Sequence, residues 1–584
     1  MFKTLVSLVL LTLPLPVWAL ACGDAHTPIA SVQGSESATP MAGQSVTVEG
    51  ILTLDTRQPG GFQGFYLQQA FHEQDADPAT SEAIFIHTRA ENGKPGDRVR
   101  VTGKAGEYYG LTSLSSVRSI TVCGSPGLPP PVDFDPGQTP EDAREALESM
   151  LVQIGQPLVV VDTWNLARYG ELVLAPDLQW TTTQVRRPAG DRAREFQQQD
   201  SVRLLLDDGE RRQQPRPVPW PPGGLQPSSP VRIGDQVSQL TGVLDYRFGH
   251  WRLQPIKTPL FTHTSPRGPA PERHHDANLR VVSLNLANLF NGNGQGGGFP
   301  TARGARTLNA FRQQEARLIT QITVMDPDIL VVAELENDGY DSNSAVAQLA
   351  AGLGTQWDFV RGETHTHNDA IRNGVLYRSD RVRTLGTARL MDQGAFQRWH
   401  RPAVSQEFEL ISGSEPITIV AVHLKSKSCQ GAPPAQRDVG DGQACYTAAR
   451  TEAAQELAEQ FGDYSASSKA VLLAGDFNAY AMEDPLQALA EAGYRDLVRA
   501  FHGTRMATFR YHGRLGTLDY HLANQTAAER ALASHIWAVN VEEPRIFAYD
   551  APQGLDLAEN YLWRASDHNP VITDLKLRPS GAVR

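Results

Sequence analysis

The most informative stretch of the chain is LLAGDFNAYAMEDP, residues 472–485, where an apolar run ends in acidic and amide side chains. The run stops at Gly475 and is followed by Asp476 and Asn478. Residues of these types are common in turns, so the motif alone does not require a function. The alternative is chemical, because a carboxylate and a carboxamide two residues apart can face one metal ion or one phosphate.

Polar residues that suit metal ions or phosphates recur at the ends of apolar runs in the C-terminal half of the chain. They are Asn285 after VVSL, Glu334 after DILVVA, His423 after ITIVAV, Asp519 in GTLDY, and Asp567 and His568 in RASDHNPV. A loop explains one such residue, but so many in one domain indicate a shared site. The pattern therefore predicts a polar cluster at the edges of buried strands.

The elements that must position these residues form an α/β pattern. Apolar strands such as LRVVSLNLANLF alternate with helical segments such as TLNAFRQQEARLITQITVM, which predicts one large domain at residues 279–578. Upstream, residues 22–125 and 145–262 contain short alternating strands separated by turn residues, and a proline-rich segment follows each region. We therefore expect two β-rich regions, the first of them a small barrel or sandwich.

The composition fits a large, folded and exported protein. The chain has 584 residues and a net charge of −12, so it lacks the strongly basic surface that announces many nucleic-acid-binding proteins. Residues 1–21 have the pattern of a signal peptide, with Lys3, an apolar stretch and an Ala-Leu-Ala cleavage site. Acylation of Cys22 is an alternative. We expect a secreted protein, periplasmic or extracellular, without stable membrane insertion.

The four cysteines, Cys22, Cys123, Cys429 and Cys445, predict disulfides in an exported chain. Proximity in the sequence favours the pairs Cys429–Cys445 and Cys22–Cys123. A zinc site fits less well, because no CxxC or HxxxH spacing accompanies these residues.

Taken together, the motifs N…E…H…GDFNA…LDY…SDHNPV resemble the endonuclease/exonuclease/phosphatase superfamily over about residues 280–577. Within it, NLFNGNGQGGGFPTARGA, AELENDG, HLKSKSC and GDFNAYAMEDP are similar to bacterial extracellular nucleases of the ExeM type. The resemblance implies an α/β fold in which a four-layer α/β sandwich, like that of pancreatic deoxyribonuclease, follows β-rich, OB-like N-terminal domains. The OB-like domain is expected at residues 22–125.

The resemblance also implies which residues hold the metal and the substrate. Asn285, Glu334 and Asp567 are the expected metal ligands, and their oxygen atoms suit Mg²⁺, with Mn²⁺ or Ca²⁺ as alternatives. Asn478 is expected to hold a phosphate oxygen through its amide group. Arg401, in HRPAVSQEF, is a second phosphate-binding candidate because a guanidinium group presents a bidentate fork.

Five further residues are expected to carry out the proton transfers. Asp476 activates or orients the attacking water. His423 and His568 act as acid, base or cation beside the phosphate, and each needs a carboxylate to orient it. Asp519 is the expected partner of His568, and Asp369, in HNDAIRNGVLYR, is the candidate partner of His423.

The leading hypothesis is a secreted, divalent-metal-dependent endonuclease that hydrolyses DNA, or alternatively RNA, with low sequence specificity and without a protein partner. One alternative is a phosphatase or phospholipid phosphodiesterase of the same superfamily. Another is a non-catalytic protein that binds nucleic acid or an extracellular matrix. In the first β-rich region, Phe65, Tyr66, Tyr108 and Tyr109 have side chains that can stack on bases, although packing in a core is the favoured interpretation.

Overall fold

The computed structural model describes residues 21–75, 77–362, 369–462, 469–551, 555, 557–558 and 560–580. The predicted signal peptide, residues 1–21, lies outside the described residues except for Ala21. The chain forms two compact units. The smaller contains Met1–Val132, Asp142–Val152 and Val243–Gly249, and the larger contains Asp133–Glu141, Gln153–Gly242 and His250–Arg584.

The smaller unit contains a closed five-stranded barrel. Its strands follow one another around the barrel in the order β1 (Ser45–Asp55), β2 (Gly64–Gln68), β3 (Ala83–His87), β5 (Leu111–Gly124) and β4 (Arg98–Tyr108). A short helix, α1 (Ile29–Gln33), packs its apolar residues into the barrel core. Phe65 and Tyr66 are fully buried, as the core interpretation predicted, whereas Tyr108 and Tyr109 are exposed.

Both predicted disulfides are present. Cys22–Cys123 lies in the smaller unit and Cys429–Cys445 lies in the larger one. The first bond occupies the thiol that acylation of Cys22 would need. Because disulfides persist in oxidising compartments, these two indicate an extracytoplasmic environment. Among the described residues, none of the helices combines the length and the apolar character needed to span a bilayer.

The larger unit is built around two six-stranded sheets. The first has the order β17 (Trp357–Phe359), β18 (Ile371–Arg378), β16 (Ile329–Glu336), β15 (Leu279–Leu289), β28 (Val571–Leu575) and β27 (Ala531–Ile536). The second has the order β19 (Val382–Met391), β20 (Ala403–Leu410), β21 (Ile417–His423), β22 (Ala470–Asp476), β26 (Asp519–Ala523) and β23 (Arg495–Asp496). The central pairs β15–β16 and β21–β22 are parallel.

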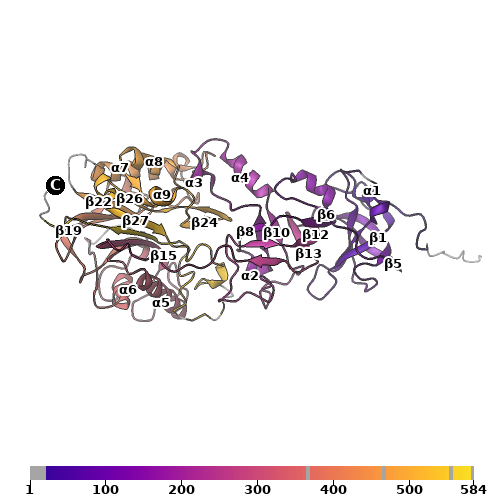
Figure 1. The fold of residues 1–584 in the computed structure, drawn as a ribbon, viewed down its shortest axis with the longest axis horizontal. Helices are drawn as coiled ribbons and strands as arrows, with labels where there is room; N and C mark the ends of the chain where they lie inside the picture. Colours follow the sequence, from indigo (N-terminus) through magenta and orange to yellow (C-terminus); the bar gives the residue numbers. More distant parts are fainter. Residues whose placement is uncertain are drawn as a thin grey trace, which may run out of the picture. The chain divides into compact units, whose positions relative to one another are not determined.

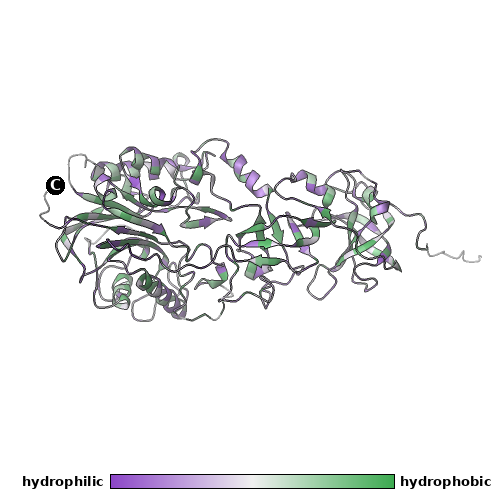
Figure 2. Ribbon diagram, in the orientation of Figure 1, coloured by the Kyte–Doolittle hydropathy of each residue, from purple (hydrophilic) through white to green (hydrophobic). Residues whose placement is uncertain are grey.

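The two sheets pack face to face, and helices cover their outer faces. Residues of both sheets share one core, among them Val281, Val331, Ile419 and Leu472. Helices α5 (Leu308–Met325) and α6 (Ala345–Leu353) pack on the first sheet, and α7 (Thr447–Gly462) and α8 (Asp484–Glu491) pack on the second (Figure 1). The strands are mainly hydrophobic and the helices are hydrophilic on one side (Figure 2). The predicted mixed α/β fold is confirmed.

A second set of strands in the larger unit precedes these sheets, and we call it the β-module. Its strands have the order β14 (Leu260–Thr262), β11 (Gln236–Ser238), β8 (Leu158–Asp162), β9 (Leu172–Ala175), β10 (Leu204–Leu206) and β13 (His250–Pro255). The helices α2 (Leu166–Tyr169), α3 (Thr182–Val185) and α4 (Arg192–Ser201) connect them. Three further strands, β6 (Val132–Asp133), β7 (Leu151–Ile154) and β12 (Leu240–Arg247), include residues of both units.

A hairpin of the C-terminal region fixes the β-module. The hairpin consists of β24 (Phe509–Tyr511) and β25 (Arg514–Gly516), and short helices α9 (Leu497–His502) and α10 (Gln525–Ala528) lie on either side of it in sequence. The backbone N–H of Thr181 donates to the carbonyl of Leu515 at 2.9 Å. The Gln184 Oε1 accepts a hydrogen bond from the Thr517 N–H at 3.0 Å. The module and the two sheets are therefore joined by backbone as well as side-chain contacts.

Two buried histidines make the stability of this unit sensitive to acid. Burial lowers the pKa of His400 and of His521 to about 3. His400 Nδ1 accepts a hydrogen bond from the Lys425 N–H at 2.9 Å, which requires the neutral ring. In the unfolded chain both rings have a pKa of about 6.5, so unfolding takes up protons below that value. Each histidine therefore reduces the free energy of unfolding as the pH falls from about 6.5 towards 3.

We expect His521→Gln to remove half of this effect. The free energy of unfolding of the variant minus that of the wild type should be about 2 kcal/mol more positive at pH 5 than at pH 7. Urea unfolding at the two pH values measures the difference, and His250→Gln, at an exposed position, is the control. A difference that does not change with pH would contradict a buried neutral His521.

Candidate active site

Three predicted site residues lie side by side at one end of the second sheet. His423 is opposite Asp476 in the parallel pair β21–β22, and Asp476 is opposite Asp519 in the antiparallel pair β22–β26. The Nε2 of His423 is 3.5 Å from Oδ2 of Asp476. All three side chains are buried. Strand register thus joins residues that are far apart in the sequence.

The first sheet contributes Asn285 and Glu334 to the same cluster. The Nδ2 of Asn285 donates to Oδ2 of Asp476 at 3.3 Å, and Asn285 also hydrogen-bonds the Glu334 carboxylate. The register of β16 against β18 shifts between Val332 and Leu335, and Glu334 has a φ of 59°. A bulge of this kind redirects a side chain, and a left-handed conformation at a non-glycine residue is typical of functional sites.

The motif GDFN forms a turn and a part of the site at once. Gly475 has a φ of 130°, and a Cβ atom there would lie 2.2 Å from the Val422 carbonyl oxygen, so glycine is required. Asn478 has a φ of 49°, and its N–H donates to Oδ1 of Asp476 at 2.8 Å. The Asn478 Nδ2 donates to the Leu424 carbonyl at 3.1 Å. The turn therefore fixes the rotamer of Asp476 and places Asn478 beside β21.

His568 and Asp519 form a buried hydrogen-bonded pair, as the sequence predicted. The Nδ1 of His568 lies 2.6 Å from Oδ2 of Asp519. Thr508 supports the pair because its Oγ1 accepts a hydrogen bond from the Asp519 N–H at 3.0 Å. Burial alone lowers the pKa of His568, but Asp519 outweighs it, with help from Asp567 and Asp476, and raises that pKa to about 10. His568 is therefore a cation near neutral pH.

His423, in contrast to His568, is neutral, and its neighbours are different. Burial, followed by the charge of Arg401, lowers the pKa of His423 well below its usual value. Within the described residues its Nδ1 is buried and makes no hydrogen bond. Its Nε2 is 3.3 Å from Nη1 of Arg401. At the site, the His423 ring is therefore neutral and the His568 ring is a cation.

Among the described residues, the expected pairing of His423 with Asp369 is not found. Oδ2 of Asp369 instead accepts a hydrogen bond from Nε of Arg401 at 2.9 Å, and Oδ1 lies 3.3 Å from Nη2 of Arg303. Arg401 also donates to the Leu424 carbonyl at 3.1 Å. Two arginines therefore hold the Asp369 carboxylate, and one of them, Arg401, also contacts His423.

Negative charge is concentrated where the two sheets meet. Burial raises the pKa of Glu334, and the nearby Asp567 raises it further. Burial, followed by the charge of Asp519, raises the pKa of Asp476 to about 7. Asp567 is exposed at the rim of the site. Asn285 and Glu334 thus lie near Asp476, and Asp567 interacts electrostatically with Glu334.

In the part of the chain that the structure describes, two groups of residues have the spacing of metal ligands. In one, oxygen and nitrogen atoms of Asp476, Asp519 and His568 all lie within 4.8 Å of one another. The hydrogen bond between Asp519 and His568 already uses two of these three side chains, and a protonated imidazole does not ligate a metal. The other group, His274, His275 and Asp276, lies in the linker before β15.

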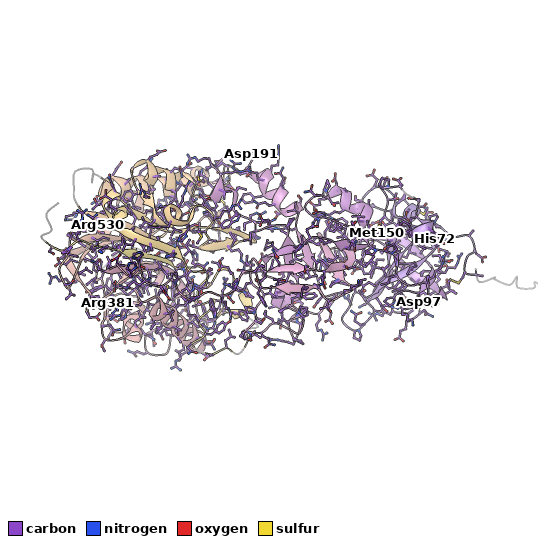
Figure 3. All side chains as sticks on the ribbon, in the orientation of Figure 1. His72, Asp97, Met150, Asp191, Arg381 and Arg530 are labelled. Carbon is purple, nitrogen blue, oxygen red and sulfur yellow. A yellow bond between two sulfur atoms is a disulfide. The ribbon has the colours of Figure 1, made fainter. Side chains whose placement is uncertain are left out.

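The structure shows contacts around the site that the sequence did not indicate. Ser566 donates from its Oγ to the Asn285 carbonyl at 2.6 Å, which links the SDHNPV loop to β15. Nζ of Lys427 lies 2.6 Å from Oε2 of Glu483, so this lysine is held in an ion pair. Figure 3 labels Arg381 and Arg530, two residues of the larger unit outside the site. Arg381 pairs with Asp328 at 2.7 Å, and Arg530 pairs with Glu415 at 2.5 Å. A short motif does not reveal such pairings.

Residues 282–568 match the model of the Endonuclease/Exonuclease/phosphatase family, and residues 130–265 match a domain of unknown function (DUF8508). No curated protein matches the chain.

Among solved structures, the chain is similar to the human Nocturnin catalytic domain with bound sulfate, at 16% identity and a TM-score of 0.35, covering 52% of this chain and 96% of that one. It is similar to D. rerio TDP2 complexed with a single-strand DNA product, at 14% identity and a TM-score of 0.33, covering 50% and 97%. It is also similar to a mannosyl-6-phosphatase of Bacteroides thetaiotaomicron, at 15% identity and a TM-score of 0.33, covering 51% and 99%.

Proposed function

We propose that the chain is an exported nuclease, because residues 282–568 match the model of the Endonuclease/Exonuclease/phosphatase family. It hydrolyses phosphodiester bonds of DNA, or alternatively RNA, as an endonuclease of low sequence specificity related to the ExeM type. The observation that carries this proposal is the hydrogen bond of 2.6 Å between His568 and Asp519 beside the acidic cluster. A buried cation next to carboxylates suits a reaction in which negative charge develops on a phosphate.

The donor set fits a divalent cation that binds oxygen. Asn285, Glu334 and Asp567 come from three different segments. The charge of Asp567 raises the pKa of Glu334, and the charge of Glu334 raises the pKa of Asp476, so a bound cation would relieve this repulsion. Mg²⁺ is the expected ion, with Mn²⁺ and Ca²⁺ as alternatives. When bound, it supplies neutralisation of charge on the phosphate and its leaving group.

The remaining residues bind the phosphate and move protons. Asp476, held by the Asn478 N–H, orients the attacking water and accepts its proton. His568 uses Nδ1 for Asp519, which leaves Nε2 to donate a proton to the leaving oxygen. On the side of Asp476 away from the Asp519–His568 pair, Asn478 and the neutral ring of His423 contact phosphate oxygens. Arg401 holds the phosphate, and Asp369 positions Arg401.

We expect Arg401→Lys to lower kcat/KM for a phosphodiester by about 10- to 100-fold, because an ammonium group cannot hold Asp369, the Leu424 carbonyl and a phosphate oxygen together. Steady-state hydrolysis of bis(p-nitrophenyl) phosphate measures the effect. Arg398→Lys, at an exposed position three residues earlier, is the control. Equal losses in both variants would exclude a specific role for Arg401.

The barrel of the smaller unit is proposed to be OB-like and to bind nucleic acid. Its closed five-stranded order β1-β2-β3-β5-β4 and its exposed Tyr108 and Tyr109 support this role. We propose export because residues 1–21 have the pattern of a signal peptide. The two disulfides agree with export.

A substrate panel tests the proposed function. Disulfide-bonded protein is incubated with bis(p-nitrophenyl) phosphate, p-nitrophenyl phosphate, phospholipid vesicles, DNA and RNA, with Mg²⁺ or with a chelator. We expect metal-dependent cleavage of the diester and of nucleic acid, and little hydrolysis of the monoester. Turnover confined to the monoester or to phospholipid would replace the nuclease by the corresponding alternative. Tight DNA binding without turnover of any substrate would indicate a binding protein.

A further inference from the structure

A cavity of about 700 Å³ opens beside the catalytic cluster and is lined by two separate parts of the larger unit. Ser566 and Asp567 line it on the catalytic side, and Trp164 lines it on the side of the β-module. The β24 segment, Phe509–Tyr511, lines it as well. The space therefore extends from a proposed metal ligand to a surface that belongs to another module.

The aromatic residues in this cavity differ in exposure. Phe509 packs against His568, with ring centroids 4.7 Å apart, and so belongs to the wall of the catalytic site. Farther along, 61% of Tyr511 and 66% of Trp164 are exposed. Large aromatic side chains that stay exposed beside a polar site are the groups on which bases stack.

Each of the three arginines that line the cavity already holds an acceptor of the protein. Arg510 pairs with Asp162 at 2.5 Å, and Arg545 pairs with Asp550 at 2.5 Å. Arg564 donates from Nη1 to a backbone carbonyl at 2.7 Å. A cavity whose arginines are held by carboxylates and carbonyls is a poor cradle for a phosphate. It suits an uncharged, planar and polar-edged group.

Asp162 fixes the position of Trp164. Its Oδ1 accepts a hydrogen bond from the Trp164 N–H at 2.9 Å and also accepts the one from Arg510. One carboxylate therefore ties the β-module to the residue between Phe509 and Tyr511. The guanidinium of Arg545 lies 6.0 Å from the Trp164 ring, which adds a weak cation–π contact. The tryptophan is exposed but its backbone is anchored to the catalytic side.

We propose that this cavity is a nucleobase subsite, in which the base next to the scissile phosphate leaves its neighbours and stacks on Trp164 and Tyr511. The inference rests on the proposed nuclease function. A base that enters the cavity cannot remain in a base pair, so unpaired nucleotides are the preferred substrate. Trp164 belongs to the domain of unknown function at residues 130–265. That domain thus helps to select the substrate in addition to connecting modules.

The test compares one linkage with and without its neighbouring base. Short single-stranded DNA is made with normal nucleotides, or with a tetrahydrofuran abasic residue on the 5′ or 3′ side of a defined linkage. Cleavage at that linkage is followed by product length for the wild type, Trp164→Ala, Trp164→Phe and Phe501→Ala. Phe501 is a matched control because it is an exposed aromatic residue on α9, outside the cavity.

The wild type should cleave the normal linkage about 5- to 150-fold faster, in kcat/KM, than one of the two abasic linkages, which is the range for one stacked base. Trp164→Ala should reduce this ratio mainly through KM, because only Tyr511 then remains for stacking. Trp164→Phe should keep much of the ratio, and Phe501→Ala should keep all of it. Equal cleavage of normal and abasic linkages by the wild type, or an unchanged ratio in Trp164→Ala, would overturn the subsite while the nuclease proposal stands. Failure to cleave any strand would overturn both.

Discussion

His568→Ala is expected to reduce kcat for phosphodiester hydrolysis by about 10²- to 10⁴-fold, which is the usual range for a residue that transfers a proton in the transition state. Asp519 holds the ring through Nδ1, and its charge keeps the ring protonated. The measurement is kcat at saturating Mg²⁺ with bis(p-nitrophenyl) phosphate and with DNA. KM should change much less than kcat.

The Asp519 partner provides the control for this first prediction. Asp519→Asn keeps the size of the side chain but removes its charge, so it should lower kcat as well. In the double variant the losses should not multiply, since both residues act through one proton. His502→Ala, at an exposed histidine on α9, should be neutral. Multiplicative losses, or equal losses in His502→Ala, would show that His568 and Asp519 do not form a functional unit.

Removal of the divalent ion, or of its proposed acidic ligand, is expected to have a comparable effect. A chelator should abolish hydrolysis, and Mg²⁺ should restore it. Glu334→Gln keeps the shape of the ligand but removes the charge, so the Mg²⁺ concentration for half-maximal activity should rise by at least about 100-fold, which is the upper range for indirect partners of a metal. Calorimetric titration with Mn²⁺ provides a readout that does not depend on turnover.

Glu336→Gln is the matched control for the metal prediction. Glu336 lies two residues farther along β16, but its Oε2 accepts a hydrogen bond from the Asn291 N–H at 2.8 Å and does not belong to the cluster. Its substitution should leave the Mg²⁺ dependence unchanged. Full activity of the wild type in the presence of a chelator, or identical Mg²⁺ dependence in Glu334→Gln, would contradict the assignment of a metal site here.

The strand-end residues could be predicted from the sequence because strand register brings them together. His423, Asp476 and Asp519 each follow or begin a nearly continuous apolar run, and such runs become the central strands of a buried sheet. Asn285 was predicted in the same way. The disulfides followed from proximity in the sequence. The strand-end residues and the disulfides could be predicted because each depends on a local sequence pattern and on few other residues.

The neighbours of Arg401 and the aromatic cavity could not be predicted in the same way. Asp369 has a carboxylate that can pair with either Arg401 or His423, and only the packing of β18, β20 and β21 decides between them. Trp164 meets Arg545 and the β24 segment across more than three hundred residues of sequence. The left-handed backbone at Glu334 has no local signal, because glutamate does not favour it.

The central claim is that the cluster around Glu334, Asp476 and His568 cuts internal phosphodiester bonds. The most direct measurement is nicking of closed-circular plasmid DNA by the disulfide-bonded wild type and by His568→Ala, with Mg²⁺ or with a chelator. We predict Mg²⁺-dependent conversion of closed circles to nicked circles by the wild type, and its loss in the variant and with the chelator. An intact plasmid after incubation of folded wild type with Mg²⁺ or Mn²⁺, or equal nicking by His568→Ala, would contradict the claim.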